Sequence, residues 1–196
     1  MKKLLIASSN PGKIQELTAL LQGLGLLLVT PHDIGLHLKV EETGVTYAEN
    51  AAKKAAEYSL ASGLSTLADD SGLEVDVLGG APGIRSARFS PQPGATDADR
   101  RMYLLEKLSG HQPPWTAHFH CTVALSQPGE KIVFAEGECR GEIIPEQRGS
   151  HGFGYDPIFQ LSGLGKTMAE LDMQEKNRLS HRSKAVKAAI PLLTEM

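Results

Sequence analysis

A short polar segment near the N-terminus combines a positive charge with backbone suited to binding an anion. Its residues are Ser8, Ser9, Asn10, Pro11, Gly12 and Lys13. The segment lies between a predicted strand and a predicted helix, so its backbone N–H groups and the positive end of the helix dipole are exposed to a ligand. It lacks the GxxxxGK[ST] spacing of a P-loop. We predict a phosphate-binding loop, with an ordinary strand-to-helix turn as the alternative.

Carboxylates gather at two places in the first half of the chain, at Glu41 and Glu42 and at Asp69 and Asp70. The two aspartates follow an apolar strand predicted over residues 64–68, and ligands of α/β sheets usually bind at the carboxyl ends of strands. Neighbouring carboxylates repel unless a cation or a proton lies between them. Mg²⁺ takes one or two protein carboxylates together with substrate phosphates. The pattern predicts a magnesium site, with a plain Asp/Gly turn as the alternative.

Two lysines follow in a predicted Ala-rich helix. Glu49 and Lys53 are four residues apart, and so are Asn50 and Lys54. This spacing places each pair on one face of a helix. Lys54 is therefore a candidate phosphate contact, while a pair of solvated lysines is the alternative.

A glycine-rich segment in the second half surrounds an aromatic side chain. Its residues are Gly152, Phe153, Gly154, Tyr155 and Asp156. Glycines let a flat ring approach the backbone closely, and stacking on a base contributes about 1–3 kcal/mol. Phe153 is a candidate for base stacking, and the alternative is that both aromatic rings fill the core beside an Asp-Pro turn.

Three possible hydrogen-bond donors lie near the predicted start of the last helix: Lys176, His181 and Arg182. Together they could recognise the oxygen-bearing edge of a base. A purely structural histidine is the alternative.

The elements that must position these groups are those of an α/β protein. Predicted strands cover about residues 2–8, 26–29, 64–68, 73–77, 117–125 and 131–141. Predicted helices follow Asn10, a capping box at Thr46 and Glu49, Thr96, and a second capping box at Thr167 and Glu170. A last helix starts near Ser180, and Pro191 should kink or interrupt it. Because strands and helices alternate early and a hairpin follows, we predict one α/β domain over residues 1–196 with a mixed sheet.

Composition excludes several classes of function. A formal net charge of −3 argues against a sequence-independent nucleic-acid binder. No apolar run approaches the roughly 18 residues that cross a bilayer, and the apolar stretch from Leu4 to Ala7 is too short for a signal peptide. We expect a cytoplasmic protein with no membrane or nucleic-acid partner, in which Cys121 and Cys139 are buried free thiols.

Taken together, these segments resemble the inosine triphosphate pyrophosphatase family, also called the Ham1 or non-canonical purine NTP pyrophosphatase family. The matching stretches, in order, are SSNPGK, EETG, ENAAKKA, LADDSGLEVDVLGGAPGIRSAR, FHC, GFGYDPIF and SHR. The resemblance implies an elongated mixed β-sheet flanked by helices, in two lobes with an active-site cleft between them. It also implies a homodimer that uses Mg²⁺ to hydrolyse ITP, dITP and XTP between the α- and β-phosphates.

The resemblance also assigns roles by matching position. Glu41 and Asp70 match magnesium ligands, and Asp70 matches the general base, with Asp69 as the alternative base. The matching substrate contacts are Ser8, Ser9, Asn10, Pro11, Gly12, Lys13, Lys54, Ser71, Phe153, Gly154, Tyr155, Asp156, Lys176, His181 and Arg182. Donors at the last three positions would favour the 6-oxygen of hypoxanthine or xanthine over the amino group of adenine.

Two other functions compete with this interpretation. A non-catalytic nucleotide sensor would need the glycine-rich loops but no paired acids, so the three residues Glu41, Asp69 and Asp70 argue against it. A pyrophosphatase for modified pyrimidine nucleotides would share the general architecture, but the GFGYDP and SHR stretches favour the purine enzyme.

Overall fold

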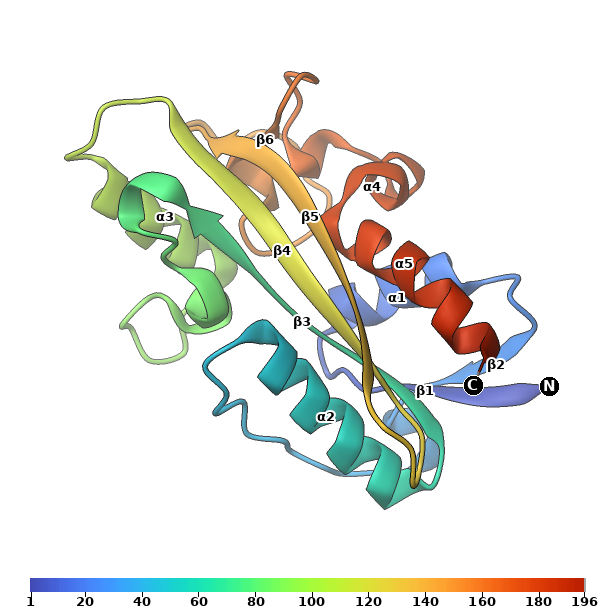
Figure 1. Cartoon of the computed structure of the whole chain (residues 1–196). Helices are drawn as coiled ribbons and strands as arrows, with labels where there is room; N and C mark the ends of the chain where they lie inside the picture. Colours follow the sequence, from blue (N-terminus) through green and yellow to red (C-terminus); the bar gives the residue numbers. More distant parts are fainter. Residues whose placement is uncertain (196) are drawn as a thin grey trace. The chain divides into compact units, whose positions relative to one another are not determined.

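A six-stranded sheet with the strand order β2-β1-β3-β4-β5-β6 is the centre of the fold in the computed structural model (Figure 1). The structure describes residues 1–195, without the side chain of Glu195. The strands are β1 (Lys2–Ile6), β2 (Leu26–Val29), β3 (Ser65–Val75), β4 (Trp115–Ser126), β5 (Val133–Ile143) and β6 (Phe159–Leu161). β1 pairs in parallel with β2 and β3, whereas β5 and β6 are antiparallel. The predicted α/β fold with a mixed sheet is confirmed.

Five α-helices accompany the sheet in the described part of the chain. They are α1 (Pro11–Leu21), α2 (Tyr47–Ser62), α3 (Asp97–Leu108), α4 (Met173–Leu179) and α5 (His181–Glu195). Thr96 caps α3 as predicted. The predicted capping box at Thr167 and Glu170 is formed, but it opens a 3-10 helix of only three residues, Met168–Glu170. The separate helix α4 was not predicted. Pro191 was predicted to kink or interrupt the last helix, and it does not interrupt α5. No described helix is long and apolar enough to cross a membrane.

The chain groups into two compact units, neither of which is continuous in sequence. The first contains residues 1–70 and 121–137 and the chain from His181 onward; the second contains residues 71–120 and 138–180. β3, β4 and β5 each contribute residues to both units. Three of the four boundaries fall inside strands and the fourth lies between α4 and α5, so no linker in the sequence marks the division.

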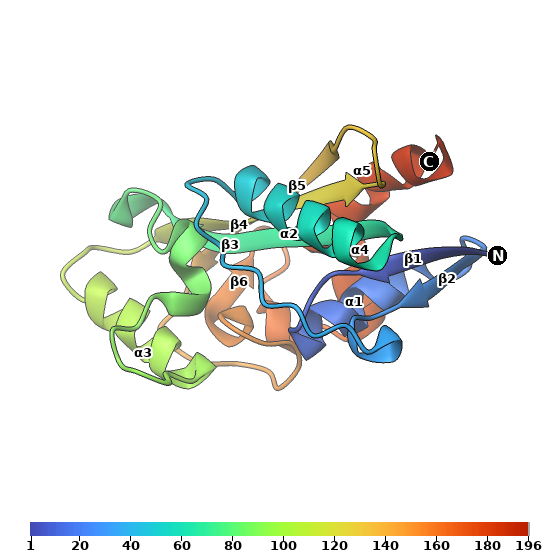
Figure 2. The same ribbon diagram turned by 90° about the horizontal axis from the view of Figure 1, so that it is seen from below.

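The first unit has a separate apolar cluster on each face of its strands. Leu4, Ile6 and Leu67 pack with side chains of α1 and α5. Leu5 and Ala68 pack with side chains of α2. Neighbouring residues in a strand point to opposite faces, so this alternation fixes which helix each strand residue meets. α2 and α5 accordingly lie on opposite sides of these strands (Figure 1), and α2 runs beside β3 in Figure 2.

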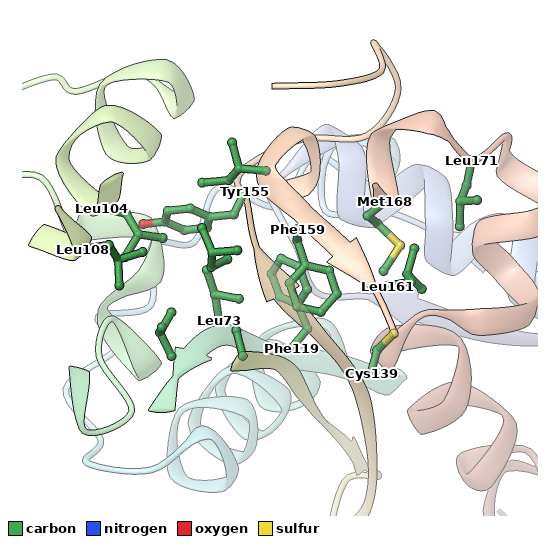
Figure 3. Close-up of a cluster of buried hydrophobic side chains, with 14 residues drawn as sticks. Leu73, Leu104, Leu108, Phe119, Cys139, Tyr155, Phe159, Leu161, Met168 and Leu171 are labelled. Atoms are coloured by element: carbon green, nitrogen blue, oxygen red, sulfur yellow. The ribbon is translucent and has the colours of Figure 1, made fainter. Parts of the chain in front are cut away.

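The second unit has its own core around two aromatic rings (Figure 3). The rings of Phe119 and Phe159 are 4.6 Å apart between centroids. Leu73, Met168 and the ring of Tyr155 belong to the same buried cluster. Cys121 and Cys139 are free and buried, which confirms the prediction for the two thiols.

Candidate active site

Asp69 and Asp70 lie in the middle of a strand, not in a turn at its end. β3 is continuous over Ser65–Val75, so the separate strands predicted over 64–68 and 73–77 are one element. The prediction was wrong because an Asp-Asp-Ser-Gly run favours a turn unless its carboxylates find buried partners. Both aspartates find such partners, and the alternation of a strand sends the two side chains to opposite faces of the sheet.

Asp69 faces α1 and α5 and is enclosed by cations. Its side chain is 1% exposed. Oδ2 lies 3.0 Å from the Lys13 ammonium and accepts a hydrogen bond from Nε of Arg182 at 3.0 Å. Burial by itself raises the pKa of Asp69, but the charges of Lys13 and Arg182 outweigh it and hold that pKa well below its usual range. Asp69 is therefore a permanent anion that holds two cations.

Arg182 is the largest fully buried side chain in the chain that the structure describes. Its guanidinium donates to Asp69 and also to the buried carboxylate of Glu16 on α1. Burial lowers the pKa of Arg182, but these two carboxylates outweigh the effect and raise it. The ion pairs join α1, β3 and the start of α5.

Asp70 faces α2 and has a different environment. The side-chain amide of Asn50 donates to its Oδ2 at 3.1 Å, and the Lys54 ammonium lies 3.9 Å from its Oδ1. Burial raises the pKa of Asp70; Lys54 and Lys13 oppose this effect, and Glu42 adds to it. The net result is a raised pKa, which makes Asp70 a better proton acceptor than Asp69.

The acidic loop over residues 41–45 is held by the beginning of α2. Lys54 donates to Glu42 at 2.5 Å and to the carbonyl of Asp69 at 2.7 Å. Lys53 donates to the hydroxyl of Thr43 at 3.2 Å. Burial lowers the pKa of Lys54, but the surrounding carboxylates outweigh it and raise that pKa, so Lys54 stays a cation.

The predicted capping box at the start of α2 is only half formed. The hydroxyl of Thr46 accepts from the backbone N–H of Glu49 at 3.1 Å, as expected. The Glu49 carboxylate, however, accepts from the N–H of Val45 at 2.7 Å and so reaches one residue further back than a capping box requires. Glu49 thus holds the end of the acidic loop.

The predicted phosphate loop forms the N-terminal end of α1. Asn10 is the N-cap, and its side chain accepts from the backbone N–H of Lys13 at 3.2 Å. Ser9 and Pro11 are exposed, while Ser8 and Gly12 are half-buried. The loop follows β1 directly, so the N-terminal end of α1 lies at the carboxyl end of that strand. Pro11 has no N–H, and the N–H of Lys13 is taken by Asn10.

In the second unit, the carboxylate of Asp156 fixes the first part of the glycine-rich segment. Asp156 and Lys176 are each 3% exposed, and Oδ2 of Asp156 lies 2.6 Å from the Lys176 ammonium. The same oxygen accepts from the backbone N–H of Phe153 at 2.9 Å. The ammonium of Lys176 lies 5.0 Å from the centroid of the Phe153 ring. At Gly152, with a φ of +74°, an added Cβ would clash with the Asp156 carboxylate.

The neighbouring residues of this segment have structural contacts. Gly154 donates its N–H to Asp97 at 2.7 Å, and its carbonyl accepts from Arg101 at 2.7 Å. Tyr155 is buried and donates its hydroxyl to the carbonyl of Ser86 at 2.9 Å. Tyr155 therefore fills the core, as the alternative interpretation had it, while Phe153 stays half-buried. Ser71, also half-buried, follows Asp70 in β3.

The three predicted purine donors are all buried. The exposed fractions are 3% for Lys176, 4% for His181 and 1% for Arg182. Lys176 is paired with Asp156, and Arg182 is paired with Asp69 and Glu16. Lys176 and Arg182 thus hold protein carboxylates, which the sequence alone did not predict.

The donors available for a metal fit Mg²⁺. Glu41 is exposed on the acidic loop, and Asp70 presents a carboxylate beside the anchor of that loop. Among the described residues, no group of three or more His, Cys, Asp or Glu side chains is placed to hold a metal ion. One or two carboxylates completed by substrate phosphates is the mode of binding typical of magnesium.

Two residues of this region carried no signal of their own in the sequence. Glu16 is a buried helical carboxylate whose partner Arg182 is 166 positions away. Asn50 was noted only for its spacing from Lys54, but it contacts Asp70 across 20 positions. Only the polar residue type within an otherwise Ala-rich buried helical face could have indicated Asn50.

The chain is similar to known proteins over nearly its whole length. A family model described as the Ham1 family matches residues 4–192. A dITP/XTP pyrophosphatase from Desulforamulus reducens is 45% identical, covering 99% of this chain and 96% of the relative. One from Gloeobacter violaceus is 48% identical, covering 95% of this chain and 92% of the relative.

Solved structures of similar proteins share the fold. A HAM1 protein from Coxiella burnetii has a TM-score of 0.88 at 40% identity and covers all of both chains. The Ham1 protein of Staphylococcus aureus has a TM-score of 0.85 at 37% identity and covers 99% of both chains. With the mixed sheet and the two aspartates of β3, these matches confirm the resemblance found in the sequence: the chain belongs to the Ham1 family.

Proposed function

We propose that the protein is a magnesium-dependent pyrophosphohydrolase that converts ITP, dITP and XTP to the nucleoside monophosphate and pyrophosphate. Its relatives named dITP/XTP pyrophosphatase match over nearly their whole length. The observation that carries the proposal is the difference in surroundings between the two adjacent carboxylates of β3. Asp69 is paired with Lys13 and Arg182, whereas Asp70 has a raised pKa beside Asn50 and Lys54.

Each residue near Asp70 has a proposed part in the reaction. Asp70 orients a water molecule and takes its proton as the water attacks the α-phosphorus, and pyrophosphate leaves. The first turn of α1 and the cations Lys13 and Lys54 hold the triphosphate. Glu41 and Asp70 would hold Mg²⁺, which when bound would offset negative charge on the phosphates.

The nucleoside is proposed to bind the glycine-rich segment around Phe153 and the three donors Lys176, His181 and Arg182. Phe153 is half-buried in a segment that Asp156 fixes, which supports a stacking role for its ring. We keep Lys176, His181 and Arg182 as the donors that select a 6-oxygen over a 6-amino group. A homodimer in the cytoplasm, without a nucleic-acid or membrane partner, remains part of the proposal.

A substrate panel tests the proposed function. Pyrophosphate and nucleoside monophosphate are quantified from ITP, XTP, dITP, GTP, ATP, CTP and dTTP, with Mg²⁺ and with EDTA. We expect turnover of the first three with Mg²⁺ and little with EDTA. Preference for modified pyrimidine nucleotides, or tight binding without turnover, would support one of the competing functions.

A further inference from the structure

Asn50 is a buried amide in the first unit, and both ends of its side chain are in use. It is 1% exposed. Oδ1 accepts from the backbone N–H of Gly44 at 2.8 Å, and Nδ2 donates to Oδ2 of Asp70 at 3.1 Å. The N–H of Gly44 can only donate, so the atom facing it must be the amide oxygen. The amide nitrogen is therefore directed at Asp70, and the opposite orientation of the amide loses both hydrogen bonds.

Gly44 leaves the space that this contact needs. An added Cβ would lie 2.8 Å from Oδ1 of Asn50 and 2.7 Å from Cβ of Glu49. Both are shorter than normal contacts. Cβ of Glu49 is attached directly to the helix backbone, and Oδ1 of Asn50 is the buried atom that accepts from Gly44, so the methyl group would displace this contact. The glycine is thus explained by the close approach of the acidic loop to α2.

The two hydrogen bonds of Asn50 join the two proposed sources of metal ligands. Gly44 lies in the acidic loop with Glu41, and Asp70 belongs to β3. The other α2 anchors of the loop, Glu49, Lys53 and Lys54, are exposed or half-buried. The Asn50 contact is buried, so water competes little for its hydrogen bonds.

We infer that Asn50 is a positioning residue: its amide holds the Asp70 carboxylate and the Glu41–Gly44 loop in the one arrangement in which both serve the reaction. The inference rests on the proposed function, because it gives Asp70 and Glu41 the roles stated there. The inference gives Asn50 itself no contact with substrate or metal. Residues that orient metal ligands in this way typically change metal affinity or activity by about 10- to 100-fold when they are replaced.

Replacement of the amide tests the inference. Asn50→Asp keeps the shape and the acceptor for Gly44 but replaces the donor to Asp70, and Asn50→Leu removes both hydrogen bonds at similar volume. We expect kcat for ITP to fall by about 10- to 100-fold in both variants. KM should change much less, because the triphosphate contacts of α1 are untouched. Mn²⁺ affinity, measured by calorimetry with a non-hydrolysable ITP analogue, should fall in parallel.

Gly44→Ala tests the same contact from its other end. It changes neither Asn50 nor Asp70, yet the added methyl group displaces the loop from the amide. We expect the same selective loss of kcat and Mn²⁺ affinity. In the double variant with Asn50→Asp the losses should be less than additive, because both changes break one arrangement.

Ser59→Ala is the matched control on the same helix. Ser59 is also 1% exposed, and its hydroxyl donates to the carbonyl of Leu64 at 3.0 Å. This variant loses a buried hydrogen bond away from Asp70 and should keep wild-type kcat and Mn²⁺ affinity. A kcat and Mn²⁺ affinity within about twofold of wild type in folded Asn50→Asp or Gly44→Ala, or equal losses in Ser59→Ala, overturn the inference.

Failure of the proposed function has a different signature. If the wild-type protein does not hydrolyse ITP, that function is wrong, whereas the Mn²⁺ titrations of the four single variants still test the Asn50 contact. If the wild type is active and the Asn50 and Gly44 variants are as active as the Ser59→Ala control, the inference alone fails. Urea unfolding of each variant identifies any that does not fold, and Gly44→Ala and Asn50→Asp then stand in for Asn50→Leu.

Discussion

Asp69 and Asp70 are consecutive residues of β3 whose carboxylates face opposite sides of the sheet and meet different partners. Asp69 meets Lys13 and Arg182, while Asp70 meets Asn50 and Lys54. The period of two in a strand separates two chemically identical side chains into a structural anion and a candidate base. A substitution at either aspartate therefore leaves the side-chain partners of the other in place.

Asp69→Asn should strongly destabilise the fold. The substitution leaves Lys13 and the buried guanidinium of Arg182 without the anion between them. Removing one partner of a buried ion pair typically costs about 3–5 kcal/mol. Urea denaturation measures the free energy of unfolding, and Asp33→Asn, at an exposed aspartate far along the chain, provides the comparison. A loss below about 1 kcal/mol would show that Asp69 does not hold these cations.

Arg182→Ala separates a structural role from a role in selecting the base. Its pairs with Asp69 and Glu16 are buried, so we expect a loss of about 3–5 kcal/mol in the free energy of unfolding. If Arg182 also recognises the 6-oxygen, the ratio of kcat/KM for ITP to that for ATP should fall. An unchanged ratio in the folded fraction assigns Arg182 to the structural role alone.

Gly137→Ala should disturb the start of α5. An added Cβ at this position of β5 meets the carbonyl oxygen of His181 and the backbone nitrogen of Ala185. Backbone atoms cannot move aside as a flexible side chain can, so we expect a loss of about 1–3 kcal/mol in urea denaturation. At Gly110 an added Cβ meets no atom within 4 Å, and Gly110→Ala should be neutral. Equal stability of the two variants would contradict the close packing of α5 on β5.

Phe153→Ala should weaken nucleotide binding without a preference among purines. Stacking contributes about 1–3 kcal/mol per base, which corresponds to a rise of about 5- to 150-fold in KM. Every purine presents a similar ring face, so KM for ITP and ATP should rise by similar factors. Phe153→Tyr keeps a ring and should stay near wild type. A wild-type KM for Phe153→Ala would remove Phe153 from the nucleoside site.

Much of the fold could be predicted from local patterns in the sequence. A short apolar run indicated β1, alternating apolar residues indicated β4, and Thr96 indicated the start of α3. These signals act over a few residues, which is the range of a strand period or a helix cap. The continuity of β3 could not be predicted, because it depends on partners far along the chain that make buried carboxylates stable.

The candidate site was predictable in its residue types but not in their roles. Lys13, Lys54 and Asp70 were identified as candidates from motif and spacing. That Arg182 pairs with Glu16 follows only from the packing of α5 on α1, which joins residues 166 positions apart. The role of Asn50 likewise depends on the distance between α2 and β3 and on the missing side chain at Gly44.

The most direct test of the account is the turnover of ITP by Asp70→Asn, measured with ITP binding in the same preparation. General-base catalysis typically contributes about 10²–10⁴-fold, so kcat should fall by about 100-fold or more. The affinity for ITP should change little, because the first turn of α1 is intact. If Asp70→Asn kept more than about a tenth of the wild-type kcat, Asp70 would not be the general base.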